Sequence, residues 1–242
     1  MKVLITGASG QVGTALLASA PAQIETRTLT REHLDIRDAG AVRSAVEAFR
    51  PALIINAAAY TAVDKAESEP ELALAINAEG PRHLAQAAHA LPGCRLLHIS
   101  TDYVFDGAAT EPYKPGDPTN PLSVYGRSKL LGEGTPTAAA SIARALWALA
   151  QRPQIRGILH WTDAGQASWY DFAVAIAQEG HAAGLLRAQG PVTPITTDDY
   201  PTLAHRPANS VLDTRESIAQ LGLTPPPWRV NLRATLANIA VA

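Results

Sequence analysis

The sequence predicts an α/β protein whose core is a doubly wound parallel sheet. Short apolar runs alternate with stretches of helical periodicity over residues 1–100, which is the pattern of successive β-α-β units. A glycine-rich turn directly follows the first apolar run, where a first strand would pass into a first helix. The chain of 242 residues suits one domain, or one domain with a small second lobe.

The elements of the first half follow from apolar runs, caps and helix breakers. Apolar or alternating runs predict buried strands at Lys2–Thr6, Glu25–Leu29, Leu53–Asn56 and Arg95–Ser100. Helical periodicity predicts helices at Val12–Ala20, from Asp38 to Arg50, and from Pro70 to near Leu91. Asp38 is a suitable N-cap for the second helix, and the Gly80-Pro81 pair predicts a kink in the third.

The second half of the chain is less regular. Helices are expected at Ser123–Glu133, Ala138–Ala150 and Ser168–Gln178, and a further strand at Gly157–Trp161 is expected to join the sheet. We therefore expect a sheet domain at residues 1–150, to which the strand at 157–161 is added, and a C-terminal lobe at residues 162–242.

Composition excludes several classes of protein. A net charge of -2 gives no basic surface for nucleic acid or for an anionic membrane. No window approaches about 20 uninterrupted apolar residues, so we expect no membrane span. Cys94 is the single cysteine, which rules out a disulfide within the chain and favours a reducing, cytoplasmic location. The histidines and acidic residues lack the spacing of a zinc site, so we expect no metal.

The glycine turn, Gly7 to Gly13, predicts a phosphate-binding site. Glycines at such a turn permit positive φ and let the backbone approach a pyrophosphate closely. The helix that follows presents free N–H groups and a partial positive charge to the anion. Because this turn opens the first β-α-β unit, it favours a dinucleotide-binding Rossmann domain over a plain strand–helix connection.

The second strand indicates which dinucleotide is bound. An acidic residue often follows this strand in NAD-binding proteins and holds the ribose 2′-OH. Here the strand ends in Leu29-Thr30-Arg31, with an arginine and no carboxylate. Arg31 can pair with a 2′-phosphate, which favours NADPH and leaves NADH as the alternative. A solvated surface charge is an equally good interpretation of Arg31.

Tyr125 and Lys129 form the candidate catalytic pair. Their spacing of four places both on one face of the predicted helix. A lysine ammonium beside a phenol lowers the pKa of the phenol, which then becomes a usable general acid near neutral pH. Ser100 and Thr101 end the preceding strand at the edge where ligands bind, and either hydroxyl can bond a substrate carbonyl or simply cap the strand.

With these residues in place, the chain resembles the dTDP-4-dehydrorhamnose reductase family of extended short-chain dehydrogenases. The matching motifs span nearly the whole chain: GASGQVG (Gly7–Gly13), NAAAYTAVDKAE (Asn56–Glu67), NAEGP (Asn77–Pro81), HISTDYVFDG (His98–Gly107), NPLSVYGRSK (Asn120–Lys129), SWYDFA (Ser168–Ala173) and RPANSVLD (Arg206–Asp213). Related sugar-nucleotide dehydratases place an acidic residue where Tyr103 stands.

The resemblance implies an NADPH-dependent reduction of the C4 ketone of a dTDP-4-keto-6-deoxy sugar. Tyr125 would protonate the ketone oxygen, Lys129 would tune Tyr125 and hold the nicotinamide ribose, and Thr101 would bond the same oxygen. Cofactor-binding positions would be Gly7, Ser9, Gly10, Gln11, Val12, Gly13, Arg31, Asp35, Ile36, Asn56, Ala57, Ala58, Ala59, Tyr60, Asn77, Ser100, Tyr125 and Lys129. Substrate-binding positions would be Asp64, Thr101, Asp102, Tyr103, Val104, Trp169 and Arg206, although helix packing is an equal interpretation of Trp169.

The resemblance breaks between Glu133 and Gly134, where a few dozen family residues are absent. In the family a further strand follows the Tyr-Lys helix and contributes to the sheet and the sugar pocket. Its loss predicts an exposed sheet edge, which Gly157–Trp161 or a second copy in a homodimer would cover. Two function classes therefore stay open: a reductase of dTDP-sugars, and a non-catalytic NADP(H)-binding regulatory subunit or truncated relic.

Overall fold

A computed structural model describes residues 1–130 and 138–241, and its core is a four-stranded parallel sheet. The strands are β1 (Lys2–Thr6), β2 (Glu25–Leu29), β3 (Leu53–Asn56) and β4 (Arg95–His98), in the order β2-β1-β3-β4. The four strands expected in the first half are confirmed, with β4 two residues shorter. The order reverses beside β1, so the carboxyl ends of β1 and β3 open the crevice in which ligands of such sheets bind.

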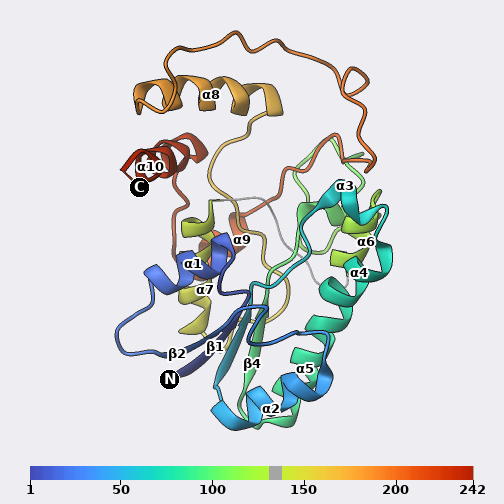
Figure 1. Ribbon diagram of the computed structural model, residues 1–242, viewed down its shortest axis with the longest axis vertical. Helices are drawn as coiled ribbons and strands as arrows, with labels where there is room; N and C mark the ends of the chain where they lie inside the picture. The colour runs from blue at the N-terminus through green and yellow to red at the C-terminus, as the bar shows by residue number, and fades with distance from the viewer. Residues whose placement is uncertain (131–137, 242) are drawn as a thin grey trace.

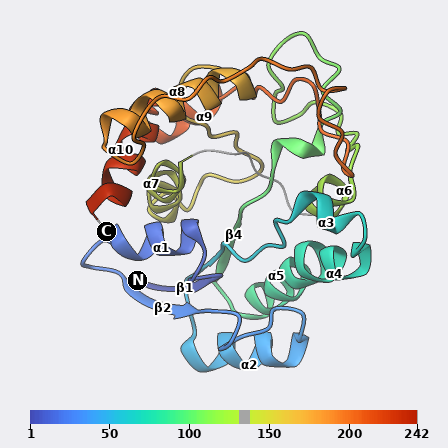
Figure 2. The same cartoon turned by 45° about the horizontal axis from the view of Figure 1, so that its top comes forward.

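Helices cover both faces of the sheet (Figures 1 and 2). One face packs against α2 (Ala39–Phe49) and α5 (Gly80–Ala90), and the other against α1 (Gln11–Ala18) and α7 (Ala139–Ala150). Successive strand residues alternate between the two layers, as the pleat requires: Leu4 and Ile54 contact α2 and α5, whereas Ile5 and Ile55 contact α1 and α7. Both faces are therefore buried, which makes the strands continuous apolar runs.

Caps and breakers act where the sequence places them. Asp38 accepts hydrogen bonds from the amides of Gly40 and Ala41 at 2.8 and 3.0 Å and begins α2. The helix expected from Pro70 consists of α4 (Pro70–Leu74), a π-helical turn (Ala75–Glu79) and α5. The change in helix type falls at Gly80-Pro81, where Pro81 has no N–H to donate.

The segments around the expected site are α3 (Val63–Ala66), a 3₁₀ turn at Asp102–Val104, and α6 (Val124–Leu130). The rest of the helix expected to reach Glu133 lies outside the described residues. The C-terminal part contains α8 (Trp169–Ala182), α9 (Arg215–Leu221) and α10 (Trp228–Val241). Glu179 of α8 joins α10 through Arg229 and Arg233 at 2.8 and 2.7 Å.

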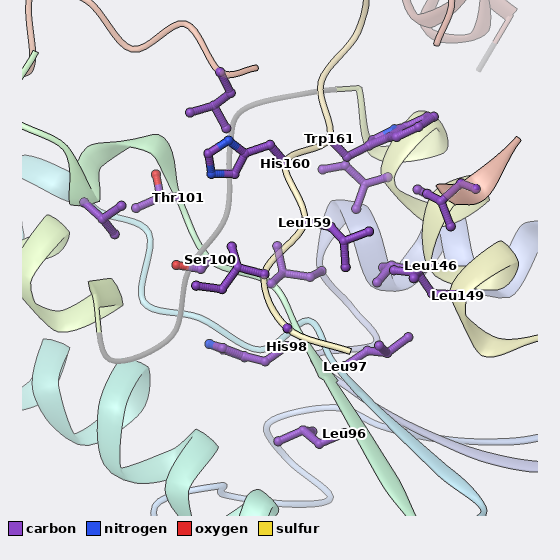
Figure 3. Close-up of a pocket in the computed structure, with 18 of the residues that line it drawn as sticks. Leu96, Leu97, His98, Ser100, Thr101, Leu146, Leu149, Leu159, His160 and Trp161 are labelled. Carbon is purple, nitrogen blue, oxygen red and sulfur yellow. The ribbon is translucent and has the colours of Figure 1, made fainter. Parts of the chain in front are cut away.

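The strand expected at Gly157–Trp161 is wrong, because these residues pair with no described strand. A strand needs a neighbour about 4.8 Å away to complete its ladder. Here a cavity of about 470 Å³ lies between β4 and residues 157–161 (Figure 3). The segment therefore runs along the sheet edge without joining it, and the division into residues 1–150 and 162–242 stays a prediction. None of the described helices has the length and apolarity needed to cross a bilayer.

Candidate active site

The glycine turn joins β1 to α1 in a conformation that only glycine tolerates at two positions. Gly7 has φ +69°, and a Cβ there would lie 2.4 Å from the Ala58 nitrogen. A Cβ on Gly13 would lie 2.3 Å from the Gly7 carbonyl oxygen. A Cβ on Gly10 would meet only that carbonyl, at 3.3 Å, so this side of the turn is open. No side chain caps α1, which leaves its first amides available to an anion.

The end of β2 lies against this turn, since the Ala8 amide donates to the Leu29 carbonyl at 3.3 Å. Arg31 follows two residues later and is exposed. Asp35 is held by Arg37 at 2.5 Å, and this hydrogen bond lowers the pKa of the Asp35 carboxyl to about 2. Ile36 is buried against Gly80, where a Cβ would lie 2.5 Å from its Cδ1. Among the described residues, Arg31 is thus an exposed cation near the turn that forms no salt bridge.

Two buried asparagines shape the loop after β3. Asn56 accepts from the Thr6 hydroxyl at 2.6 Å and from the Ala58 amide at 3.1 Å, which turns residues 57–59 across the strand ends. Asn77 accepts from the Tyr60 amide at 2.8 Å and donates to the Tyr60 carbonyl and the Ser128 hydroxyl, both at 3.0 Å. Asn77 is fully buried, so it positions Tyr60 and α6, and its direct contact with a cofactor stays a prediction.

Thr101 follows the carboxyl end of β4, and its side chain faces that of Tyr125. Gly126 makes this approach possible, because a Cβ there would lie 2.3 Å from the Tyr103 carbonyl oxygen. The Tyr103 ring packs edge-on against that of Tyr125, with centroids 5.9 Å apart. Burial raises the pKa of Tyr125, and the nearby Thr101 side chain opposes that rise.

Lys129 lies one turn after Tyr125 and is buried. Its ammonium donates a short hydrogen bond to the Ile99 carbonyl, and burial lowers its pKa to about 7. Because burial of the phenol has the largest effect, the pKa of Tyr125 lies above its usual value, and the lowering expected from Lys129 stays a prediction. The hydroxyl of Ser100 donates to the Lys129 carbonyl at 3.0 Å, which leaves Thr101 as the hydroxyl that faces Tyr125.

Asp102 fixes the position of the Thr101 side chain through a hydrogen bond. The Thr101 hydroxyl donates to Oδ1 of the Asp102 carboxylate at 3.0 Å, whereas the buried Oδ2 has no hydrogen-bond partner among the described residues. Burial raises the pKa of Asp102 to about 6, although nearby Ser210 and Thr101 oppose that rise. Val104 packs in a small core with Phe105, so its side chain is structural and its contact with a substrate stays a prediction.

Three expected substrate residues come together although they are far apart in sequence. Arg206 holds Asp64 at two points, with distances of 3.0 and 2.6 Å, and it lies close enough to Tyr103 to oppose the rise that burial causes in the pKa of that phenol. This cluster lies beside Tyr125, since Tyr103 contacts both. Trp169 is 75% exposed and contacts the Phe172 ring, so its contact with a substrate also stays a prediction.

The acidic run at residues 64–69 has a sequence typical of a solvated helix face. In the structure, two of its residues instead hold the segments around the site. Glu67 accepts from the Val124 amide at 2.7 Å and so holds the start of the helix that carries Tyr125. Glu69 accepts from the Tyr60 phenol at 2.7 Å. These roles and that of Ser210 have no local sequence signal, because each partner comes from a distant segment.

Comparison with known proteins agrees with this geometry. The model of the RmlD substrate binding domain family matches residues 1–134 and 133–241. A dTDP-4-dehydrorhamnose reductase of Aggregatibacter actinomycetemcomitans is 36% identical over 286 aligned positions, which cover 96% of this chain and 97% of the relative. The crystal structure of a dTDP-4-dehydrorhamnose reductase from Clostridium acetobutylicum superposes with a TM-score of 0.90 at 32% identity, covering 99% of each chain.

A second solved structure, the dTDP-4-dehydrorhamnose reductase of Bacillus anthracis in complex with NADP, superposes with a TM-score of 0.87. It is 28% identical and the match covers 96% of this chain and 97% of that one. The family match divides at residues 133–134, and the alignment of 286 positions exceeds the 242 residues of this chain. Both findings confirm that family residues are absent between Glu133 and Gly134, which lie outside the described structure. The chain therefore belongs to the RmlD substrate binding domain family, together with the dTDP-4-dehydrorhamnose reductases that it matches along its length.

Proposed function

We propose that this protein reduces the C4 ketone of a dTDP-4-keto-6-deoxy sugar, dTDP-4-dehydrorhamnose, with NADPH. The observation that carries the proposal is the juxtaposition of the Thr101 and Tyr125 side chains just beyond the carboxyl end of β4. It presents two hydroxyls together at the edge of the sheet that also holds the glycine turn. A ketone oxygen bound here would accept from Tyr125, and from Thr101 when the Thr101 hydroxyl turns its one proton from Asp102 to the ketone; it would then be polarised and would receive the phenolic proton.

The residues of the turn fit a dinucleotide. The open side of Gly10 and the uncapped amides of α1 would hold the pyrophosphate, and Arg31 would hold the 2′-phosphate. The loop at residues 57–60, fixed by Asn56 and Asn77, would lie along the cofactor. When bound, NADPH supplies the hydride that reduces the sugar carbon.

The chain itself moves one proton. Tyr125 would give its phenolic proton to the ketone oxygen, which becomes the C4 hydroxyl, and the phenolate would recover a proton from water. Lys129, with a pKa near 7, would carry a positive charge more readily once a phenolate is present beside it. Thr101, fixed by Asp102, would keep the oxygen within reach of Tyr125.

Asp64, Tyr103 and Arg206 would bind the nucleotide-sugar next to the reacting centre. Arginine presents planar donors that match phosphate geometry, and the exposed part of Arg206 is suitable for this role. We place the enzyme in the cytoplasm, where nucleotide sugars are made, and assign the C-terminal lobe at residues 162–242 to substrate binding.

The test is a steady-state assay that follows NADPH absorbance with dTDP-4-dehydrorhamnose as substrate. We expect substrate-dependent oxidation of NADPH that Tyr125→Phe abolishes. A second candidate is a non-catalytic NADP(H)-binding subunit, which the absent segment beside β4 favours. Calorimetric binding of NADPH without any turnover would select that candidate, and absence of both would reject the two together.

A further inference from the structure

Asp102 is an acidic side chain in the interior, and only one of its two oxygens has a hydrogen-bond partner. The residue is 1% exposed, and its Oδ1 lies 3.0 Å from the Thr101 hydroxyl. Its Oδ2 is buried and has no hydrogen-bond partner among the described residues, although Ser210 lies nearby. An ionised carboxylate in a protein interior is costly unless it is paired and its lone pairs are satisfied. These surroundings therefore favour the protonated, neutral form of Asp102.

No cation among the described residues forms a salt bridge with Asp102. The titratable groups of its own turn and of the elements around that turn are Tyr103, Tyr125, Lys129, Asp64 and Arg206. Of the two cations, Arg206 is held at two points by Asp64. Lys129 instead donates to the Ile99 carbonyl. In agreement with this arrangement, burial raises the pKa of Asp102 from 3.8 to about 6.

Thr101 has a single hydroxyl proton, and the charge state of Asp102 decides where this proton points. A threonine hydroxyl is one donor and two acceptors, whereas an ionised carboxylate can only accept. An ionised Asp102 therefore takes the proton of Thr101 and leaves a lone pair of Thr101 to the facing phenol of Tyr125. Both hydroxyl protons are then directed away from a substrate.

A neutral Asp102 reverses this arrangement without moving any heavy atom. Its carboxyl O–H donates to one lone pair of Thr101, and the Tyr103 amide donates to the other at 3.4 Å. The hydroxyl protons of Thr101 and Tyr125 are then both available to one acceptor that lies between them. A carboxylic acid that its surroundings keep neutral can serve as a hydrogen-bond donor in this way.

We propose that Asp102 is a positioning residue that works as a neutral acid, donating to Thr101 and so directing the protons of Thr101 and Tyr125 to the carbonyl oxygen of the substrate. Asp102 keeps its own proton throughout, and the proton that is transferred is the phenolic proton of Tyr125. This role rests on the proposed function, because it concerns the two hydroxyls that would bind the ketone. Ionisation of Asp102 would withdraw Thr101 from the ketone.

The charge state of Asp102 is measured on the free protein, without cofactor or sugar. Carbon-13 NMR follows the aspartate carboxyl groups from about pH 3 to about pH 8, and triple-resonance spectra assign the Asp102 signal. We expect this signal to titrate with a midpoint of about 6. A midpoint at or below the ordinary value of 3.8 would overturn the proposal, whether or not the protein reduces a sugar.

The kinetic test compares the unaltered protein with Asp102→Asn, whose amide group can donate to Thr101 at every pH. We measure kcat/KM for dTDP-4-dehydrorhamnose against pH in both proteins, and titrations that they share cancel in the ratio. The ratio of the variant to the unaltered protein should rise about tenfold between pH 6 and about pH 7.5, because Asp102 ionises in this range. A role of Asp102 as a carboxylate would make the ratio fall, and a merely structural role would leave it constant. Either result would overturn the proposal.

A Thr101→Val background tests whether Asp102 acts through Thr101. The hydroxyl is absent there, so Asp102→Asn should change kcat/KM by no more than about twofold at any pH. A rise with pH that persists in this background would overturn the positioning role. Glu47→Gln, an exposed carboxyl group on α2, is the control and should follow the unaltered protein at every pH. Circular dichroism checks that each variant is folded. Lack of turnover by the unaltered protein at every pH would contradict the proposed function, while the NMR midpoint would still decide the state of Asp102.

Discussion

Asp64 and Arg206 are 142 residues apart in sequence and form a two-point ion pair, with distances of 3.0 and 2.6 Å. The pair connects α3, which follows β3 in the chain, to the segment before α9. The hydrogen bond from Arg206 lowers the pKa of the Asp64 carboxyl, so the pair stays charged at neutral pH. Tyr103 lies close to Arg206, and its ring packs edge-on against that of Tyr125.

We expect Arg206→Leu to raise the KM for the dTDP-sugar at least tenfold, because it removes the guanidinium that we propose to bind the nucleotide-sugar. The Kd of NADPH should stay within twofold, since the glycine turn is untouched. Arg215→Leu is the matched control, because Arg215 pairs with Asp213 at 2.5 Å on an exposed surface. An unchanged KM in Arg206→Leu would show that the Asp64–Arg206 pair takes no part in substrate binding.

The pairing of Thr101 with Tyr125 predicts the effect of removing the acid. We expect Tyr125→Phe to reduce kcat by about 10²–10⁴-fold, because a positioned general acid contributes a factor of this size. Cofactor affinity, measured by calorimetry, should be nearly unchanged. Turnover equal to that of the unaltered protein would remove Tyr125 from the mechanism.

Arg31 is expected to select NADPH over NADH. Hydrogen bonds to a charged group contribute about 1.5–3 kcal/mol, so Arg31→Ala should weaken NADPH about tenfold or more and leave NADH nearly unchanged. Arg43→Ala, an exposed arginine on α2, is the control. Titration calorimetry with both cofactors decides the point, and tighter binding of NADH by the unaltered chain would contradict it.

Two glycines of one turn should respond differently to alanine. Gly7→Ala places a Cβ 2.4 Å from the Ala58 nitrogen at a φ of +69°, and we expect it to lower the free energy of unfolding by at least about 1–3 kcal/mol. Gly10→Ala meets only one carbonyl, at 3.3 Å, and should leave stability almost unchanged while it weakens NADPH. Urea unfolding and calorimetry measure the two effects. Equal loss of stability in both variants would show that a side chain at position 10 is tolerated no better than one at position 7.

Asp102 predicts an unusual pH dependence of stability. Burial raises its pKa from 3.8 to about 6, so the folded state binds a proton that the unfolded state releases between these two values. Its contribution to stability is complete below pH 3.8, falls as pH rises, and is lost above about pH 6; the full difference is about 3 kcal/mol. Asp102→Asn should remove this slope in urea unfolding. A slope that persists unchanged in the variant would assign it to another group.

The sequence determined the parts of this protein that depend on neighbours along the chain. The four strands, the cap at Asp38, the break at Gly80-Pro81, and the glycine turn all follow from patterns a few residues long. The helical spacing of Tyr125 and Lys129 is equally local, and so is the interruption at Glu133, which shows as a break in a motif order. Such features are predictable because torsion preferences, periodicity and capping act over one or two turns.

Only the tertiary structure decided the contacts that join distant segments. Glu67 holds the start of α6 and Glu69 accepts from the Tyr60 phenol, although the acidic run by itself is typical of a solvated helix face. Partial burial of Tyr125 in the folded chain raises the pKa of its phenol. The tertiary structure also left Gly157–Trp161 outside the described sheet, although its sequence suits a strand. Burial, charge balance and sheet pairing depend on what else occupies the same space, and no window of sequence contains that information.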